Sequence, residues 1–319
     1  MARDLVNELL EVKSREGGRR SASSAGVSAI DELKALWPSK VGRLTAVADF
    51  FPVRIVTILE VFTRRWLEKL IDHGPPYLEH AAVLIHGGAK FDYAATVAIQ
   101  GKRVSLGQLV AHNVSLNDPG QIVTCFTKVL GSDFLKAIGQ THDRFAVERQ
   151  GAPKVPIISN VDTMMATLAR LFAARHILVH ETPSVRPYEH ADVDAFLAAA
   201  REFAHATEQT LYGRLFPDYP LTTLDMVEEA GRALYAAQQE QEDVLAKVKP
   251  LISDPLERDF LRRSQEAWTT YRDLQADLRA CNLEGGSLQP WIRIQELTRL
   301  TTVRTEELRW WIDREEGDI

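Results

Sequence analysis

Hydrophobic residues recur at three- and four-residue steps along most of the chain, and this spacing predicts helices. The clearest run lies between residues 49 and 73, where Val56, Leu59, Phe62 and Trp66 share one face and Pro52 suits the first turn. We find no segment with the polar and apolar alternation of a half-buried strand. The predicted fold class is therefore all-α.

Three further helices are predicted in the first two thirds of the chain, at residues 121–140, 159–180 and 192–212. The second of these begins with a Ser-x-x-Asp pattern, Ser159 to Asp162, that resembles a capping box. Pro183 follows its last apolar residues and marks its end.

The length of 319 residues favours two domains. The segment Phe216-Pro217-Asp218-Tyr219-Pro220 is the clearest boundary, and three long helical segments follow it at about 222–249, 254–281 and 288–315. We predict an N-terminal helix and flexible loop at 1–40, a helical domain at 41–220 and a three-helix domain at 221–319. The predicted core of the last domain consists of Leu261, Trp268, Tyr271, Leu278, Trp291, Leu297, Leu300, Leu308 and Trp311. Trp310 is adjacent to Trp311, so one of the two is expected to be exposed.

The composition, 45% hydrophobic and 26% charged, is typical of globular proteins. No apolar run approaches the ~20 residues of a membrane-spanning helix, and the first residues lack the apolar core of a secretory signal. We therefore expect a cytoplasmic protein with no membrane contact. The net charge of −6 argues against a broad basic face for nucleic acid, although a local basic cleft remains compatible with it. Cys125 and Cys281 lie in different predicted domains, so we expect free thiols.

The stretch Arg175-His176-Ile177-Leu178-Val179-His180 carries the candidate chemistry. The guanidinium group matches phosphate oxygens, and imidazole exchanges protons near neutral pH. RNA supplies its own nucleophile, the 2'-hydroxyl, so this cleavage needs a proton-transfer group and a stabiliser for the charge on phosphorus. On a helix, Arg175 and His180 point about 140° apart, but a long arginine can curl toward a histidine one turn later. Arg175 and His180 are thus a candidate phosphodiester-cleaving pair.

Two other interpretations of the same residues stay open. Basic residues at the end of a helix can simply complement its dipole. His176 and His180 share a face and could form half of a metal site, although no Asp, Glu or Cys cluster stands out to complete it. Separately, Glu60 lies beside the apolar face of the 49–73 helix, where a carboxylate needs a cation from another helix. We predict no metal and no cofactor.

The Arg175-His176-x3-His180 motif at the end of a bundle helix resembles the signature of the HEPN superfamily. Flanking segments agree with this resemblance over about residues 41–215: Arg103-Val104-Ser105-Leu106-Gly107-Gln108-Leu109, Asn117 to Leu130 with Gly131-Ser132-Asp133-Phe134, and Glu181-Thr182-Pro183. The resemblance implies a metal-independent endoribonuclease that leaves 2',3'-cyclic phosphate ends. Arg175 and His180 would be the catalytic pair, His176 a polar helper and Glu60 the polar residue that the family often carries on an early helix. It also implies a homodimer in which two motifs face each other, acting on RNA, with tRNA as one candidate.

Residues 222–315 resemble the family named for the lysozyme inhibitor LprI. The motifs are Ser264 to Asp273, Gly285-Gly286-Ser287, Leu297-Thr298-Arg299-Leu300-Thr301 and Arg304 to Leu308. Cys281 stands where the family has one cysteine, but the partner cysteine is missing near Arg293. Members are usually exported, so this departure puts export and lysozyme inhibition in doubt. We expect a toxin or anti-phage effector whose C-terminal module binds a protein inhibitor or trigger; the alternative is a non-catalytic protein-binding scaffold or antitoxin-regulated interaction protein.

Overall fold

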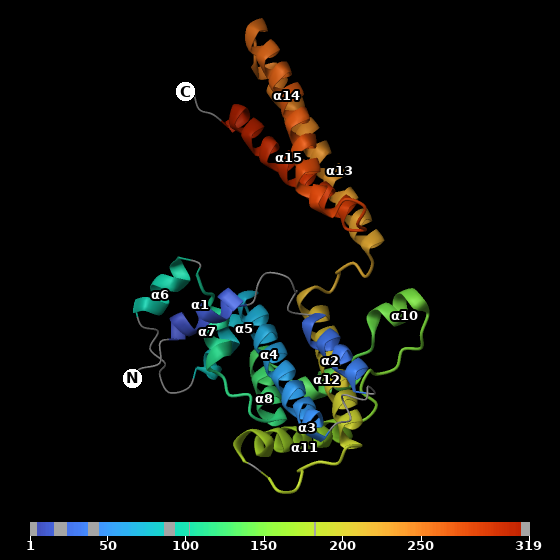
Figure 1. Ribbon diagram of the computed structural model, residues 1–319. Coiled ribbons are helices and arrows are strands. Elements are labelled where there is room, and N and C mark those ends of the chain that lie inside the picture. The colour runs from blue at the N-terminus through green and yellow to red at the C-terminus, as the bar shows by residue number, and fades with distance from the viewer. Residues whose placement is uncertain are drawn as a thin grey trace. The chain divides into compact units, whose positions relative to one another are not determined.

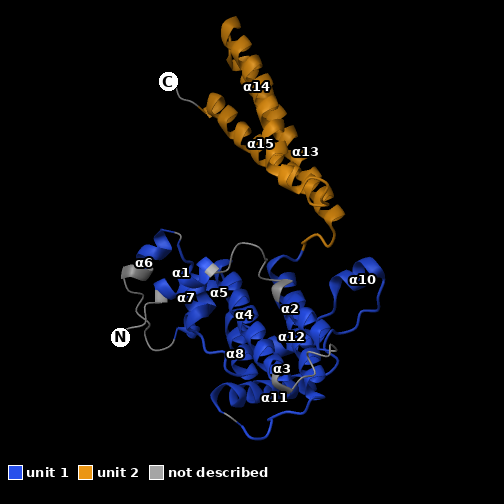
Figure 2. Cartoon of the chain, viewed as in Figure 1, with its two compact units in different colours: residues 1–217 blue, residues 218–319 orange. Residues whose placement is uncertain are grey.

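A computed structural model describes residues 5–15, 24–37, 45–85, 93–101, 103–181 and 183–313. Regular secondary structure within these ranges is entirely helical, which confirms the predicted fold class. None of the helices in these ranges is both long and apolar enough to cross a bilayer. The chain divides into two compact units, residues 1–217 (unit 1) and 218–319 (unit 2), which Figure 2 colours separately.

Unit 1 is organised around the helix α4 (Phe50–Asp72; Figure 1). The helices that pack against it most extensively are α2 (Ser24–Leu36), α7 (Leu106–Asn113), α8 (Pro119–Leu130), α11 (Val161–His180) and α12 (Asp192–Leu215). Shorter elements complete the unit: α1 (Leu5–Arg15), α3 (Thr45–Ala48), α5 (Tyr77–His80), η1 (Ala81–Leu84), α6 (Tyr93–Gln100), α9 (Phe134–Gln140) and α10 (Arg144–Gln150).

The apolar spacing of residues 49–73 explains the central position of α4, which spans Phe50–Asp72. Val56, Leu59, Phe62 and Trp66 are all buried, and Pro52 lies in the first turn as predicted. Removing such side chains from water is the main stabilising contribution to a helical bundle, at ~25 cal/mol per Å² of apolar surface. The main core gathers around α4 and includes residues of α2, α8, α11 and α12, and a smaller cluster joins α1, α6 and α7.

Two local predictions were wrong. Residues 121–140 do not form one helix, because α8 ends at Gly131, whose φ of 64° is left-handed, and α9 starts after Asp133, whose carboxylate accepts a bond from the Lys136 amide. The helix α11 is capped by Asn160, which accepts a hydrogen bond from the Thr163 amide at 2.8 Å, instead of by Ser159.

The segment predicted as an N-terminal helix and loop contains a second helix, α2, that belongs to the core of unit 1. Its Ile30 and Leu33 are buried, and Gly26 lets it approach α4 so closely that a Cβ there would lie 2.3 Å from the Phe62 ring. The predicted loop at 16–24 falls almost entirely outside the described residues.

Unit 2 consists of three long helices, α13 (Thr223–Val248), α14 (Pro255–Ala280) and α15 (Gln289–Asp313), with short turns η2 (Lys249–Leu251) and η3 (Cys281–Leu283). The helix α15 packs against both α13 and α14. Its buried face mixes Leu297, Leu300 and Leu308 with Thr301 and Thr305, whose hydroxyls donate to carbonyls four residues earlier. The buried face of α15 therefore contains threonines as well as leucines.

The predicted core of unit 2 is partly correct. Leu297, Leu300 and Leu308 are buried, and of the two adjacent tryptophans Trp310 is exposed while Trp311 packs against the apolar cluster at the C-terminal end of α13. Tyr271 and Leu278 were predicted to be core residues, but they are 55% and 64% exposed. The reason is geometric, because the buried face of α14 is formed by Ala276 and Ala280, on the opposite side of that helix.

Candidate functional site

The helix α11 presents the Arg175 to His180 stretch at its C-terminal end. Met164, Leu168, Leu171, Phe172 and Ala174 are buried along one side and fix the rotation of the helix. His180 is the last helical residue, and Glu181 is extended. In consequence His176 and His180 face outward from the bundle, and both are exposed.

Arg175 lies beside Glu60 of α4, with 3.9 Å between Nη2 and Oε1. Both side chains are partly buried, 26% and 20% exposed. The expectation that Glu60 meets a cation from another helix is thereby confirmed. At this distance the two groups attract each other without a direct hydrogen bond.

Arg175 also retains unused hydrogen-bonding capacity. Its Nε is buried, and among the described residues it has no hydrogen-bond partner. An unsatisfied donor on a charged group costs more than a neutral one, so such an atom calls for a ligand or an ordered water.

The two histidines of the motif lie together. The ring centroids of His176 and His180 are 4.8 Å apart and the rings are inclined by 48°. Arg175 turns toward Glu60 of α4, and the described residues include no hydrogen bond or ion pair between Arg175 and His180. The interaction of Arg175 that joins two helices is the one with Glu60.

The segment that follows the motif is tied to the start of α4. Asp49 accepts a bond from Arg186 Nε at 2.9 Å and another from the Tyr188 hydroxyl at 2.7 Å. Burial, together with the hydrogen bond to Asp49, raises the pKa of Tyr188, so its hydroxyl remains a donor. These bonds hold the chain beyond His180 against α4.

A pair of small pockets on the exposed side of α4 was not predicted. One, of about 160 Å³, lies against α2 and includes Arg54 and Arg65; the other, of about 230 Å³, lies against α1 and α7 and includes Lys13, Arg64 and His112. Arg65 and Val61 line both pockets, so the two adjoin. We call them together the basic groove. The sequence contains one indication of this groove, because the arginines of residues 49–73 lie outside the apolar face of that helix. The same pattern is also usual for a helix face that is simply exposed to solvent.

The cysteines and possible metal ligands are the other groups that could carry chemistry. Cys125 is buried, Cys281 is exposed and neither forms a disulfide, as predicted. In the part of the chain that the structure describes, no group of three or more His, Cys, Asp or Glu side chains is arranged to hold a metal ion.

Comparison with known proteins finds a likeness in unit 2. Residues 219–308 match the family model described as "Lysozyme inhibitor LprI", so this part of the chain is similar to that family. An uncharacterized protein of Rhizobium meliloti (strain 1021) is 35% identical over 78 residues, which are 24% of this chain and 55% of that protein. The chain thus spans about half the length of the curated relative it matches. No solved structure matches it.

Proposed function

We propose that unit 1 is a metal-independent endoribonuclease of the HEPN type, with Glu60, Arg175, His176 and His180 as its site. One observation carries the proposal: α4 and α11 bring the Glu60 carboxylate beside an arginine with an unused donor, and the same end of α11 presents a pair of neighbouring, exposed imidazoles. An arginine with only a structural role would be expected to hydrogen-bond all its buried N–H groups to carbonyl oxygens or to a carboxylate.

The residues divide the reaction between them. In the proposed reaction His180 accepts the proton of the 2'-hydroxyl as its oxygen attacks phosphorus, and His176 protonates the 5'-oxygen that leaves. Arg175 binds the phosphate oxygens, whose negative charge grows during the attack. Glu60 positions the guanidinium. The products are a 2',3'-cyclic phosphate and a free 5'-hydroxyl.

The basic groove supports RNA as the substrate. Three of its cations, Arg54, Arg64 and Arg65, lie on α4, the helix that also carries Glu60. Binding through a few cations agrees with the acidic net charge of −6, because one scissile linkage needs only a short positive surface. The proposal includes a dimer through unit 1, action in the cytoplasm on RNA such as tRNA, and a role as a toxin or anti-phage effector.

The experiment is cleavage of total RNA and of tRNA by the purified full chain in EDTA, with the fragment ends analysed. Cleavage leaving 2',3'-cyclic phosphate is expected, and His180→Ala should reduce the rate at least ~100-fold. His142→Ala is the matched control, because this histidine lies on the connection between α9 and α10, outside the site. A requirement for divalent metal, or equal loss in both variants, would contradict the proposal.

The match of residues 219–308 favours a second candidate function, protein binding by unit 2. A pocket of about 670 Å³ between α13 and α14, lined by Leu245, Leu261 and Arg258 among others, could take a side chain of a partner. This activity is compatible with the nuclease and is also what a non-catalytic scaffold would need. Titrating the chain into a lysozyme activity assay tests the partner that the family name suggests, and His180→Ala should leave any such binding unchanged.

A further inference from the structure

The helix α14 carries apolar residues on the side that faces away from its own bundle. Leu256, Phe260, Tyr271, Leu274 and Leu278 are between 55% and 64% exposed, and Ala267 among them is exposed as well. We call these six residues the outer stripe. It extends over 23 residues, from Leu256 to Leu278, and its ends are ~33 Å apart at the rise of an α-helix.

The outer stripe lies opposite the packed face of the helix. At about 100° per residue, all six side chains project within about 40° of the direction opposite to the buried Ala276. They therefore form one straight row, and neither α13 nor α15 can cover it without leaving the packed side. Two exposed apolar groups, Leu256 with Phe260 and Tyr271 with Leu274 and Leu278, thus lie on one face on either side of the small Ala267, and exposed apolar surface of this extent marks an interaction surface.

The order of residues in the outer stripe is symmetric about Ala267. Phe260 and Leu274 stand seven residues before and after it, and Leu256 and Leu278 stand eleven before and after it. Four residues away on either side are Arg263 and Tyr271. When two copies of one helix pair antiparallel about a twofold axis, a residue a given number of positions before the axis faces the residue the same number after it. This row is thus complementary to itself.

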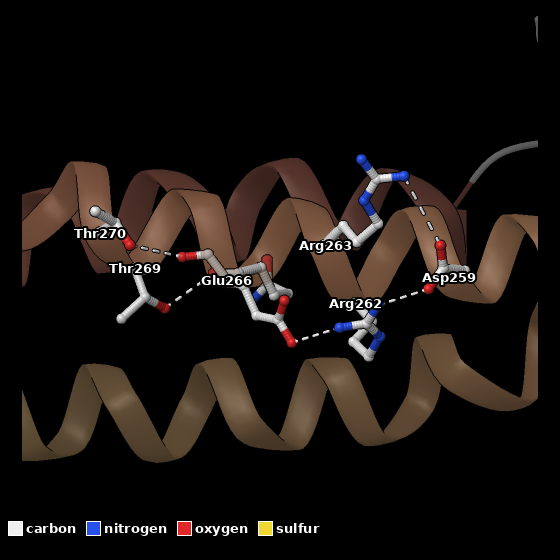
Figure 3. A network of polar contacts seen from close by, with 7 residues as sticks. Asp259, Arg262, Arg263, Glu266, Thr269 and Thr270 are labelled. Carbon is white, nitrogen blue, oxygen red and sulfur yellow. Dashed lines mark hydrogen bonds and ion pairs between the residues drawn. The ribbon is translucent and has the colours of Figure 1, made fainter.

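We propose that α14 binds α14 of a second copy of the chain, antiparallel, with Ala267 on the twofold axis. Leu256 packs against the partner subunit's Leu278, and Phe260 packs against the partner subunit's Leu274. The two small Ala267 side chains meet at the centre and allow the helices to approach closely. Arg263, which Figure 3 shows projecting to the opposite side from Arg262, lies over the ring of the partner subunit's Tyr271.

The area is sufficient for a specific pair. Five large side chains that each expose rather more than half of ~150–200 Å² remove ~500 Å² per copy, or ~1,000 Å² in total, which reaches the lower range of biological interfaces. Beside the stripe, Glu257 lies close to the partner subunit's Arg279, an opposite charge. On the other flank Asp259 comes near the partner subunit's Asp277, but each is neutralised within its own chain, Asp259 by Arg262 and Asp277 by Arg293, both at 2.6 Å (Figure 3 shows the first).

Disulfide trapping in the full chain tests the register directly, in a Cys281→Ser background in which Cys125 is buried. Ala267→Cys should give a covalent dimer on oxidation, because the two copies of this position face each other at the axis. Leu256→Cys alone should not, because its copies are ~33 Å apart, whereas Leu256→Cys combined with Leu278→Cys should. A parallel pair would cross-link at every single position, and independent chains at none; either result overturns the proposal.

Molar mass measured by sedimentation gives a second readout. Leu274→Glu combined with Leu278→Glu should weaken the dimer, so that dissociation into single chains sets in at a protein concentration at least ~10-fold higher than in the parent chain. The control is Leu224→Glu on α13, which is 65% exposed but not part of the outer stripe. An unchanged dissociation concentration in the double variant, with helix content retained, would also overturn the proposal. Neither test depends on nuclease activity.

Discussion

Glu208 on α12 is a carboxyl group in an unfavourable place. It is partly buried at the interface with α4, and burial raises its pKa to about 7, although the positive charge of Lys69 acts in the opposite direction. The Lys69 ammonium lies over the rings of Tyr212 at 4.4 Å and Trp66 at 5.0 Å. Replacing the carboxyl with the neutral amide of similar shape, Glu208→Gln, should therefore stabilise unit 1 above neutral pH.

The sign and size follow from proton linkage. The folded-state pKa of about 7 is above the ordinary value of 4.5, so the folded chain holds the proton more tightly. The associated stability is fully present below pH 4.5 and is lost as the pH rises to about 7. This difference between the folded and ordinary pKa values corresponds to ~3 kcal/mol of folding free energy. Because solvent screens a partly exposed group, the expected contribution is ~1–2 kcal/mol. Glu208→Gln should thus gain ~1–2 kcal/mol at pH 8 and little at pH 5.

The measurement must report on unit 1 alone, because a two-domain chain need not unfold in one step. Hydrogen exchange of peptides from α4 and α12, followed across a urea series at pH 5 and pH 8, meets this need. Glu79→Gln on α5 is the control, because that side chain is exposed and the substitution removes the same charge. If Glu208→Gln were no more stable than the parent at pH 8, attraction to Lys69 would outweigh burial and the reasoning would be refuted.

Three further predictions concern packing, the candidate site and the thiols. Gly107→Ala should destabilise unit 1 by ~1–3 kcal/mol, because the added Cβ would lie 2.6 Å from a backbone oxygen of α4. Gly213→Ala has open space around it and should stabilise the unit by ~0.5–1 kcal/mol. Equal effects of the two variants in thermal unfolding would show that α7 can shift to make room. Glu60→Gln should lower RNA cleavage ~10- to 100-fold without changing the fold, and an unchanged rate would show that Arg175 needs no positioning. A thiol reagent should modify the exposed Cys281 rapidly and Cys125 slowly, because burial raises the pKa of Cys125; two equally fast thiols in the native chain would contradict the packing around α8.

Much of the helical framework could be predicted because periodicity reports burial directly. Residues 49–73 form α4 within one residue of the predicted bounds, since one apolar face runs its whole length. The break between α8 and α9 was missed because apolar residues continue across it. There the backbone decides, through the left-handed Gly131 and the cap at Asp133, and one glycine within an apolar pattern is a weak signal.

The candidate site was accessible to the same kind of reasoning only in part. A carboxylate beside an apolar face needs a cation nearby, so the sequence predicts that Glu60 meets a basic residue of another helix. The sequence does not say that this residue is Arg175. The direction in which Arg175 turns depends on how α11 crosses α4, which no local pattern encodes. The basic groove was missed for the same reason, because Lys13 joins the arginines of α4 only after α1 has packed on α7. The pocket at Arg54 likewise forms only where α2 packs on α4.

Unit 2 shows why an apolar residue at helical spacing does not have to be a core residue of its own chain. Tyr271 and Leu278 fit a helical repeat, but α14 has two apolar sides, and the side with the smaller residues, Ala276 and Ala280, is the one that packs inside. Small residues let α15 come close, and the large ones remain for a contact outside the unit. A second copy joined through that contact would hold two copies of unit 1 at a high effective concentration. An enzyme whose site is completed by a second copy of itself would gain from such a tether, which connects the exposed face of one unit to the chemistry proposed for the other.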